Sequence, residues 1–243
     1  MWSIVYNNKD IIFCVTNAKP CPPRSETRGK YAGMVHILDR DVGCIVDLVD
    51  ELGLINNTLI LFTSDNGGHS TIWKGFDTNG PLRGHKRDLT EGGIRVPFIA
   101  RWPGKVQQGK TSNEIIAFQD MMPTFAELTG AKAPYNIDGI SLVNALLEKK
   151  QKIQHKYLYW AYGHCRDRYD QAVRMENWKG IRHGQDGKIQ LYNLENDLAE
   201  EKNVAENYPE VVQAIDRIMK TAIEPSEYYI IGQKYEGSPI WKK

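Results

Sequence analysis

The fold is constrained most by a short apolar run that follows a long helical pattern and ends in a polar pentapeptide. Over residues 25–52, apolar side chains recur at steps of three and four, which predicts an amphipathic helix that stops near Gly53. The run 58–63 is apolar almost throughout, and SDNGG follows it at 64–68. Such a run is typical of a strand buried on both faces, as in a parallel sheet. Helix, turn and buried strand form half of a βαβ unit, so we predict an α/β fold.

The pattern changes along the chain. Residues 96–102 predict another buried strand and 118–128 predict a helix. After about residue 150, aromatic and β-branched strands follow at hairpin spacing, and 211–222 predict an amphipathic helix. We therefore predict three parts: an N-terminal segment 1–24, part of a parallel-sheet α/β domain at 25–150, and a small subdomain with an antiparallel sheet and one helix at 151–243.

Composition and charge argue against several classes of function. Of 243 residues, 41% are hydrophobic and 25% are charged, which is typical of a folded globular chain. A net charge of +1 gives no reason to expect nucleic acid or an anionic membrane as a partner. No apolar run approaches the roughly 20 residues that span a bilayer. The N-terminus lacks the features of a signal peptide, and the four cysteines are too scattered to predict a disulfide framework.

The polar residues after the first predicted strand are candidate metal ligands. Ligands of open α/β sheets bind beyond the carboxyl ends of the strands. Asp65 and Asn66 offer a carboxylate and an amide oxygen at such a place, and both suit a hard cation. Asp-Asn-Gly is also an ordinary turn, and the tetrapeptide taken by itself favours the turn.

A basic loop bounded by glycines follows this segment. It contains four basic side chains in close succession: Arg83, His85, Lys86 and Arg87. Such a group could clamp a tetrahedral oxyanion. The alternative is a solvated loop without a ligand, which is the usual explanation of a charge run on its own.

Together these segments resemble the sulfatase family. The blocks FTSDNG, LRGHKRDLTEGGIRVPFI, DMMPTFAELTG and DGISL follow in one order, and QAVRMENWKGIR and LYNLENDLAEEKNVA extend the resemblance to about residue 206. The chain is similar to the arylsulfatase A type within the alkaline phosphatase superfamily. The resemblance implies an alkaline phosphatase-like α/β domain with a C-terminal α+β subdomain. It also implies hydrolysis of sulfate esters of carbohydrates or aryl groups.

The resemblance assigns roles to individual residues. Asp65 and Asn66 would be two ligands of an active-site Ca²⁺, and Lys86 would contact the sulfate ester oxygens as a catalytic residue. A dication and a lysine both neutralise charge on a transferring sulfuryl group. His69 and His164 would contact the substrate, and an exposed loop histidine is the alternative for each.

The sequence departs from the family pattern at the nucleophile. Sulfatases of this type carry a C-x-P-S-R motif, whose Cys becomes formylglycine, and an upstream Asp-Asp pair that completes the Ca²⁺ site. Neither occurs in the expected place. Cys21 begins CPPRS, in which the Ser and Arg positions are wrong, and it lies too close to Asp65. We therefore predict a C-terminal part with an incomplete Ca²⁺ site that is inactive alone.

Two other functions stay open. A phosphatase or phosphodiesterase of the same superfamily would use a Thr or Ser nucleophile and two metals, and a degenerate remnant would have no chemistry. The basic loop and the single Asp-Asn pair favour the sulfatase. Glu91 and Arg95 are expected to form an ion pair within the loop. The expected partner is a small-molecule or glycan sulfate ester, family analogy suggests a periplasmic or extracellular location, and the oligomeric state is unknown.

Overall fold

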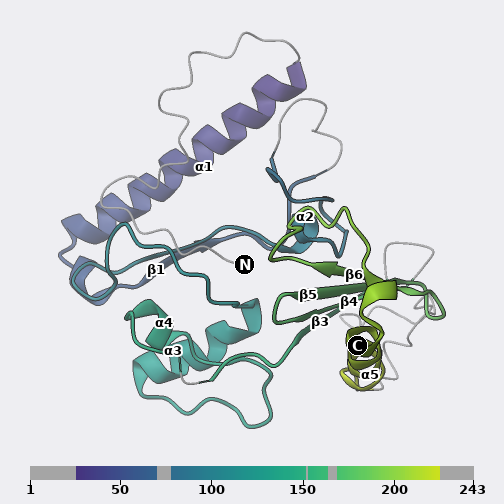
Figure 1. Ribbon diagram of the computed structural model, residues 1–243. Helices are drawn as coiled ribbons and strands as arrows, with labels where there is room; N and C mark the ends of the chain where they lie inside the picture. Colours follow the sequence, from purple (N-terminus) through teal and green to yellow (C-terminus); the bar gives the residue numbers. More distant parts are fainter. Residues whose placement is uncertain (1–25, 70–77, 152, 164–168, 225–243) are drawn as a thin grey trace, which may run out of the picture. The chain divides into compact units, whose positions relative to one another are not determined.

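The computed structural model describes residues 26–69, 78–151, 153–163 and 169–224 (Figure 1). The chain divides into two compact units that do not follow its linear order. Within the described residues, the first unit contains 26–65 and 95–155 with residues 69 and 78, and the second contains 66–68, 79–94 and the chain from 156 onward. The basic loop is therefore part of the C-terminal unit. The segment 1–24 lies outside the described residues.

The first unit contains the predicted helix and the two predicted buried strands. Helix α1 (Glu26–Glu51) confirms the helical pattern. Strands β1 (Ile60–Thr63) and β2 (Phe98–Arg101) also form, but they pair with each other antiparallel, with Ile60 opposite Arg101. The expected parallel pairing is therefore not seen in the described residues. There, β2 is the one hydrogen-bonded neighbour of β1, and β1 is half-buried along its length instead of buried on both faces.

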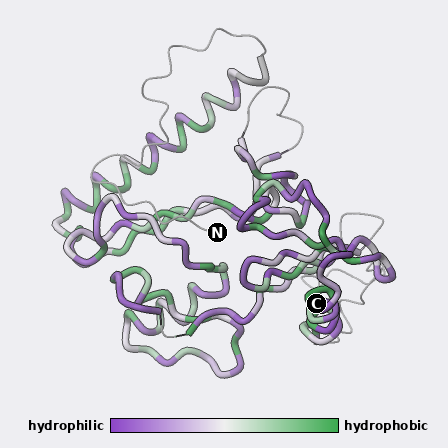
Figure 2. Tube along the Cα trace, viewed as in Figure 1, coloured by the Kyte–Doolittle hydropathy of each residue, from purple (hydrophilic) through white to green (hydrophobic). Residues whose placement is uncertain are grey.

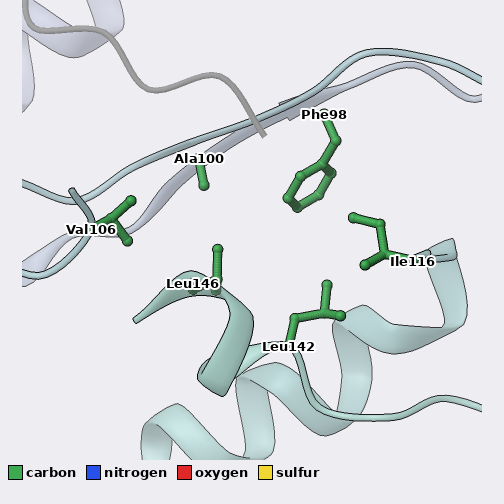
Figure 3. Close-up of a cluster of buried hydrophobic side chains, with 6 residues drawn as sticks. All are labelled: Phe98, Ala100, Val106, Ile116, Leu142 and Leu146. Atoms are coloured by element: carbon green, nitrogen blue, oxygen red, sulfur yellow. The ribbon is translucent and has the colours of Figure 1, made fainter. Parts of the chain in front are cut away.

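Below β2, short helices complete a small apolar core. These helices are α3 (Met121–Thr129), which follows the 3-10 turn Phe118–Asp120, and α4 (Val143–Leu146). The core side chains are shown in Figure 3: Phe98, Ala100, Val106, Ile116, Leu142 and Leu146. The wholly buried Asp120 accepts hydrogen bonds from the Ala117 and Ile140 N–H groups, at 2.7 and 2.9 Å. Its carboxylate thereby ties α3 to the segment that leads into α4.

Helix α1 exposes a series of large apolar side chains. Met34, Ile45 and Leu48 are 66%, 59% and 52% exposed, respectively. Figure 2 shows hydrophobic and hydrophilic residues alternating along this helix. The apolar face that the sequence predicts is therefore left largely uncovered by the described part of the chain. No helix among the described residues is both long enough and apolar enough to cross a membrane.

The second unit is built on an antiparallel sheet in the order β3-β4-β5-β6, which confirms the predicted antiparallel sheet with one helix. Its elements are β3 (Leu158–Tyr162), β4 (Asp170–Met175), β5 (Trp178–His183), β6 (Ile189–Asn193), the turn Ala205–Asn207 and helix α5 (Pro209–Thr221). Ile215 and Met219 of α5 pack with Val173 and Leu191 of the sheet. A Cβ on Gly180 would lie 2.7 Å from Cγ2 of Ile215, so this glycine permits the close approach of the helix.

The other apolar cluster of this sheet joins it to the basic loop. Ala172, Ile181 and Tyr192 come from three neighbouring strands, and Leu89 of the loop packs with them. Ile94 lies against the same cluster from the short helix α2 (Glu91–Ile94). Residues 172 and 173 are neighbours on β4 but belong to the two different clusters, as the alternation of side chains in a strand requires. Helix α5 and the basic loop therefore cover opposite faces of the sheet.

Truncating the centre of the α5 contact should destabilise the second unit. Ile215 is fully buried, so Ile215→Ala is expected to lower the free energy of unfolding by about 2–5 kcal/mol, because it removes apolar contacts and leaves a cavity. Urea denaturation followed by circular dichroism measures the change. Gln213→Ala on the exposed side of the same helix is the control and should change stability by less than about 0.5 kcal/mol. Equal effects of the two substitutions would contradict the packing.

Candidate functional site

The basic loop is hydrogen-bonded to the residues that follow β1. The Lys86 N–H donates to the carbonyl of Gly68 at 2.7 Å, and the Gly67 N–H donates to the carbonyl of Gly93 at 2.9 Å. All of these residues belong to the second unit. Two backbone bonds therefore tie the loop that carries Lys86 to the segment that begins with Asn66.

Internal bonds close the loop on itself. Asn79 bridges two turns of backbone, because its Oδ1 accepts from the Gly68 N–H at 3.1 Å and its Nδ2 donates to the Gly84 carbonyl at 2.8 Å. The Gly92 N–H donates to the Arg83 carbonyl at 2.8 Å. The segment from Arg83 to Gly92 therefore forms a closed unit rather than an open, solvated loop.

Two glycines of the predicted motifs are required by the close approach of these backbones. A Cβ on Gly67 would lie 1.7 Å from the carbonyl oxygen of Gly92, and a Cβ on Gly92 would lie 2.5 Å from the carbonyl oxygen of Arg83. Real Cβ atoms cannot approach backbone oxygens so closely. The glycines of SDNGG and TEGGI thus allow two segments, separated by about 25 residues of chain, to lie in direct contact.

The backbone around Lys86 is held in an unusual conformation. Arg87 has a φ of 79°, in the left-handed region that residues with a Cβ rarely adopt. The His85 N–H donates to Oδ2 of Asp88 at 2.9 Å, and the ring Nδ1 of His85 lies 3.0 Å from the same oxygen. Strained residues of this kind persist where the surrounding structure fixes them, and they cluster at functional sites. Lys86 itself is half-buried.

A group of buried charged side chains anchors the loop to the sheet; the group consists of Glu91, Arg174, Lys179 and Glu200. Lys179 of β5 is fully buried, and its Nζ lies 2.8 Å from Oε1 of Glu91 and 3.7 Å from Oε1 of Glu200. The Glu91 N–H donates to Oε2 of Glu200 at 2.7 Å. Arg174 lies 3.9 Å from Glu91, and the ring of Trp160 lies 5.5 Å from the Lys179 ammonium. Glu91 is thus bound through both its side chain and its backbone.

Burial raises the pKa of both carboxylates of this cluster, but the net shifts have opposite signs. Burial by itself would raise the pKa of Glu91, but the positive charge of Lys179, its hydrogen bond and the charge of Arg174 act in the opposite direction, and the pKa lies below its usual range. Burial raises the pKa of Glu200, and the opposing effect of Lys179 is the smaller one. Glu91 is therefore the carboxylate that is firmly ionised, and it forms the shorter ion pair with Lys179.

Sequence reasoning did not find this cluster. It predicted Arg95 as the partner of Glu91, and that pair stays a prediction. Lys179 lies in MENWKGIR, where a lysine between an aromatic residue and a glycine is usually an exposed strand residue. Its burial depends on the loop that covers the sheet, and the partners Glu91 and Glu200 are 109 residues apart in sequence.

Some of the predicted site residues lie within the described part of the chain and others do not. Asp65 and His69 are exposed, Asn66 is half-buried, and His164 and Cys21 lie outside the described residues. Asp65 and Asn66 supply the hard oxygen donors that Ca²⁺ takes, although two donors do not fill its shell of 6–8 oxygens. No set of three or more His, Cys, Asp or Glu side chains suited to a metal is found in the described part of the chain.

Two family models match the chain. The model described as Sulfatase matches residues 7–131, and the model described as N-sulphoglucosamine sulphohydrolase, C-terminal, matches residues 84–226. The first match begins inside the segment 1–24, ahead of the part where the sequence blocks show their resemblance. The second match contains most of the basic loop and the antiparallel sheet of the second unit, together with residues 95–155 of the first unit.

Individual relatives agree with these matches. Human steryl-sulfatase is 42% identical over 153 residues, which cover 60% of this chain and 26% of the relative. A sulfatase of Formosa agariphila is 32% identical over 225 residues, covering 83% of this chain and 39% of the relative. The crystal structure of Ps i-CgsB has a TM-score of 0.74 at 34% identity over 82% of this chain and 44% of that one. The chain spans less than half the length of each of these proteins.

These structural neighbours confirm the predicted class, an α/β fold of the alkaline phosphatase-like type. The chain belongs to the sulfatase family, since the family model covers half of it and relatives across most of its length carry the same name. The competing assignment to a phosphatase or phosphodiesterase is not favoured by these relatives.

The low pKa of Glu91 predicts a pH dependence of stability. A carboxylate whose pKa is lowered on folding from its ordinary 4.5 stabilises the protein above pH 4.5, and this contribution is lost as the pH falls through the lower pKa of the folded state. Glu91→Gln should lower stability at pH 7 and flatten the decline between pH 5 and about pH 3 in urea unfolding experiments.

Glu210→Gln, which removes an exposed carboxylate from the first turn of α5, is the matched control. Its stability should decline with acidity as the wild type does. A decline of the same steepness in Glu91→Gln would contradict the assignment of a stabilising charge to Glu91.

Proposed function

We propose that this chain forms the C-terminal part of a sulfuric ester hydrolase that acts on sulfated carbohydrate. The placement of Lys86 supports this most directly. The backbone of Lys86 is bonded to Gly68, two residues after Asn66, so the loop carries a cation to the segment that bears a proposed metal ligand. A lysine and oxygen donors on neighbouring segments suit the binding of an anionic ester together with a cation.

In this proposal, Asp65 and Asn66 bind Ca²⁺ and Lys86 contacts the sulfate oxygens. The Ca²⁺, when bound, would neutralise charge on the sulfuryl group. Lys86 contributes a point charge on a flexible stem, and its half-buried setting strengthens the attraction relative to bulk water. His69 and His164 contact the remainder of the substrate. The sequence given contains no C-x-P-S-R motif, from which the formylglycine nucleophile of the family is formed.

A sulfated carbohydrate is the substrate class that the relatives favour. Ps i-CgsB was solved in complex with k-i-k-neocarrahexaose, and it matches 82% of this chain. Another neighbour, with a TM-score of 0.65 at 25% identity, was solved with its substrate D-glucosamine-2-N,6-O-disulfate and matches 77% of this chain. Steryl-sulfatase matches only 60%. A periplasmic or extracellular location accords with the export that is usual in the family.

The isolated chain is expected to show no turnover. Two oxygen ligands leave the Ca²⁺ shell incomplete, and the sequence contains no C-x-P-S-R motif. Purified chain should release no sulfate from 4-nitrophenyl sulfate with millimolar Ca²⁺, as measured by ion chromatography. Release of sulfate by the homogeneous chain would refute this expectation and would require a nucleophile among its own residues.

Sequencing the DNA and transcript upstream of Met1 tests whether an open frame there encodes the C-x-P-S-R motif.

If it does, the longer product should hydrolyse 4-nitrophenyl sulfate faster than 4-nitrophenyl phosphate. In that product, Lys86→Ala should lower kcat by about 10²–10³-fold, because it removes a group aimed at developing charge. Lys188→Ala, an exposed lysine of the same unit, is the control and should leave kcat unchanged. A preference for the phosphate ester would overturn the proposal in favour of a phosphatase.

A further inference from the structure

The buried charge cluster holds the structural element that carries Lys86. We propose that Lys179 is a positioning residue for Lys86: by binding Glu91 it fixes the loop 82–94 on the β3–β6 sheet and so sets where the Lys86 ammonium stands. Lys179 is fully buried and cannot meet a substrate itself. This role rests on the proposed function, in which Lys86 contacts the sulfate ester.

The connection from Lys179 to Lys86 runs through short, directional contacts. Lys179 binds the carboxylate of Glu91, the first residue of α2. The next residue, Gly92, donates its N–H to Arg83 and so closes the loop that contains Lys86. The glycine contacts leave no room for this loop to slide. A displacement of Glu91 would therefore displace Lys86 with it.

The Lys179–Glu91 ion pair restricts the position of the loop more tightly than apolar packing does. Leu89 and Ile94 already provide an apolar contact with the sheet. A buried ion pair adds little net stability over apolar side chains of similar size, because desolvation offsets the attraction. Breaking one is costly, however, since an uncompensated charge stays buried. In any shifted position of the loop, the buried Lys179 ammonium would lose its contact with Glu91. The ion pair therefore favours one loop position among those that the apolar contacts would allow.

The bond between the Glu91 N–H and Glu200 strengthens this selection. Glu200 accepts from the backbone at 2.7 Å while Lys179 contacts both carboxylates. The loop is thus fixed at one residue by a side-chain contact and a backbone contact together. Two points of attachment define orientation as well as position, which a lysine that contacts a sulfate ester requires.

Amide hydrogen exchange in the isolated chain tests whether Lys179 holds the loop. Lys179→Met keeps most of the length of the side chain and removes the charge. It should accelerate exchange of the Lys86 and Gly67 amides, measured by NMR, by about a hundredfold or more. Exchange in the β1–β2 pair of the first unit should not change. If Lys179→Met fails to fold, Glu91→Gln removes the charge from the other partner and should give the same local acceleration.

A double-mutant cycle with inorganic sulfate as the probe separates positioning from general stability. Sulfate binding is followed at the backbone amide of residue 86. Lys179→Met should weaken binding about tenfold, and it should cause no further loss when combined with Lys86→Ala. Lys179→Arg, which keeps the charge, should recover part of the affinity. A destabilised fold without a positioning role would instead give additive losses.

Unchanged exchange at Lys86 in Lys179→Met, or additive losses of sulfate affinity, would overturn the positioning role. A wild-type chain that binds no sulfate at all would instead count against the role of Lys86 in the proposed function. In that case the exchange experiment still decides whether Lys179 holds the loop, so the two failures are distinguishable.

Discussion

The ion pair between Lys179 and Glu91 is the contact on which the candidate site depends. It joins the central part of the antiparallel sheet to a loop 88 residues earlier in the chain, and both groups are almost wholly removed from water. The two charges lie 2.8 Å apart and are shielded from water, so their attraction is only weakly screened by solvent. The basic loop that carries Lys86 is attached to the sheet through this ion pair.

The organisation of the chain into units explains why the loop and the C-terminal sheet occur together. Both faces of the sheet are occupied, one by α5 and the other by the loop. A four-stranded sheet with one bare face would expose apolar side chains such as Ile181 and Ala172. The loop therefore serves as structural cover for the sheet, while the sheet serves as a support for the loop.

The site could be predicted from the sequence only where a motif is local. Asp65, Asn66 and Lys86 lie in short blocks whose residue types suggest oxygen ligands and an anion clamp, so they could be named in advance. Lys179 and Glu200 could not, because their significance arises from burial against a distant loop. His164 lies outside the described residues, and its role stays a prediction. The antiparallel pairing of β1 with β2 in the described residues could not be read from the sequence, because an apolar run indicates burial but not the direction of the neighbouring strand.

By itself, the sequence determined the family, the α/β class, the long first helix and the antiparallel sheet with its helix. Each of these follows from local periodicity or from blocks of residues that occur in a fixed order. Only the tertiary structure decided that the Lys86 loop belongs with the C-terminal sheet, that Gly67 and Gly92 are required by touching backbones, and that Lys179 is buried between carboxylates. The physical reason is that burial and charge pairing depend on which distant segments meet, and a linear pattern of residue types does not encode that contact.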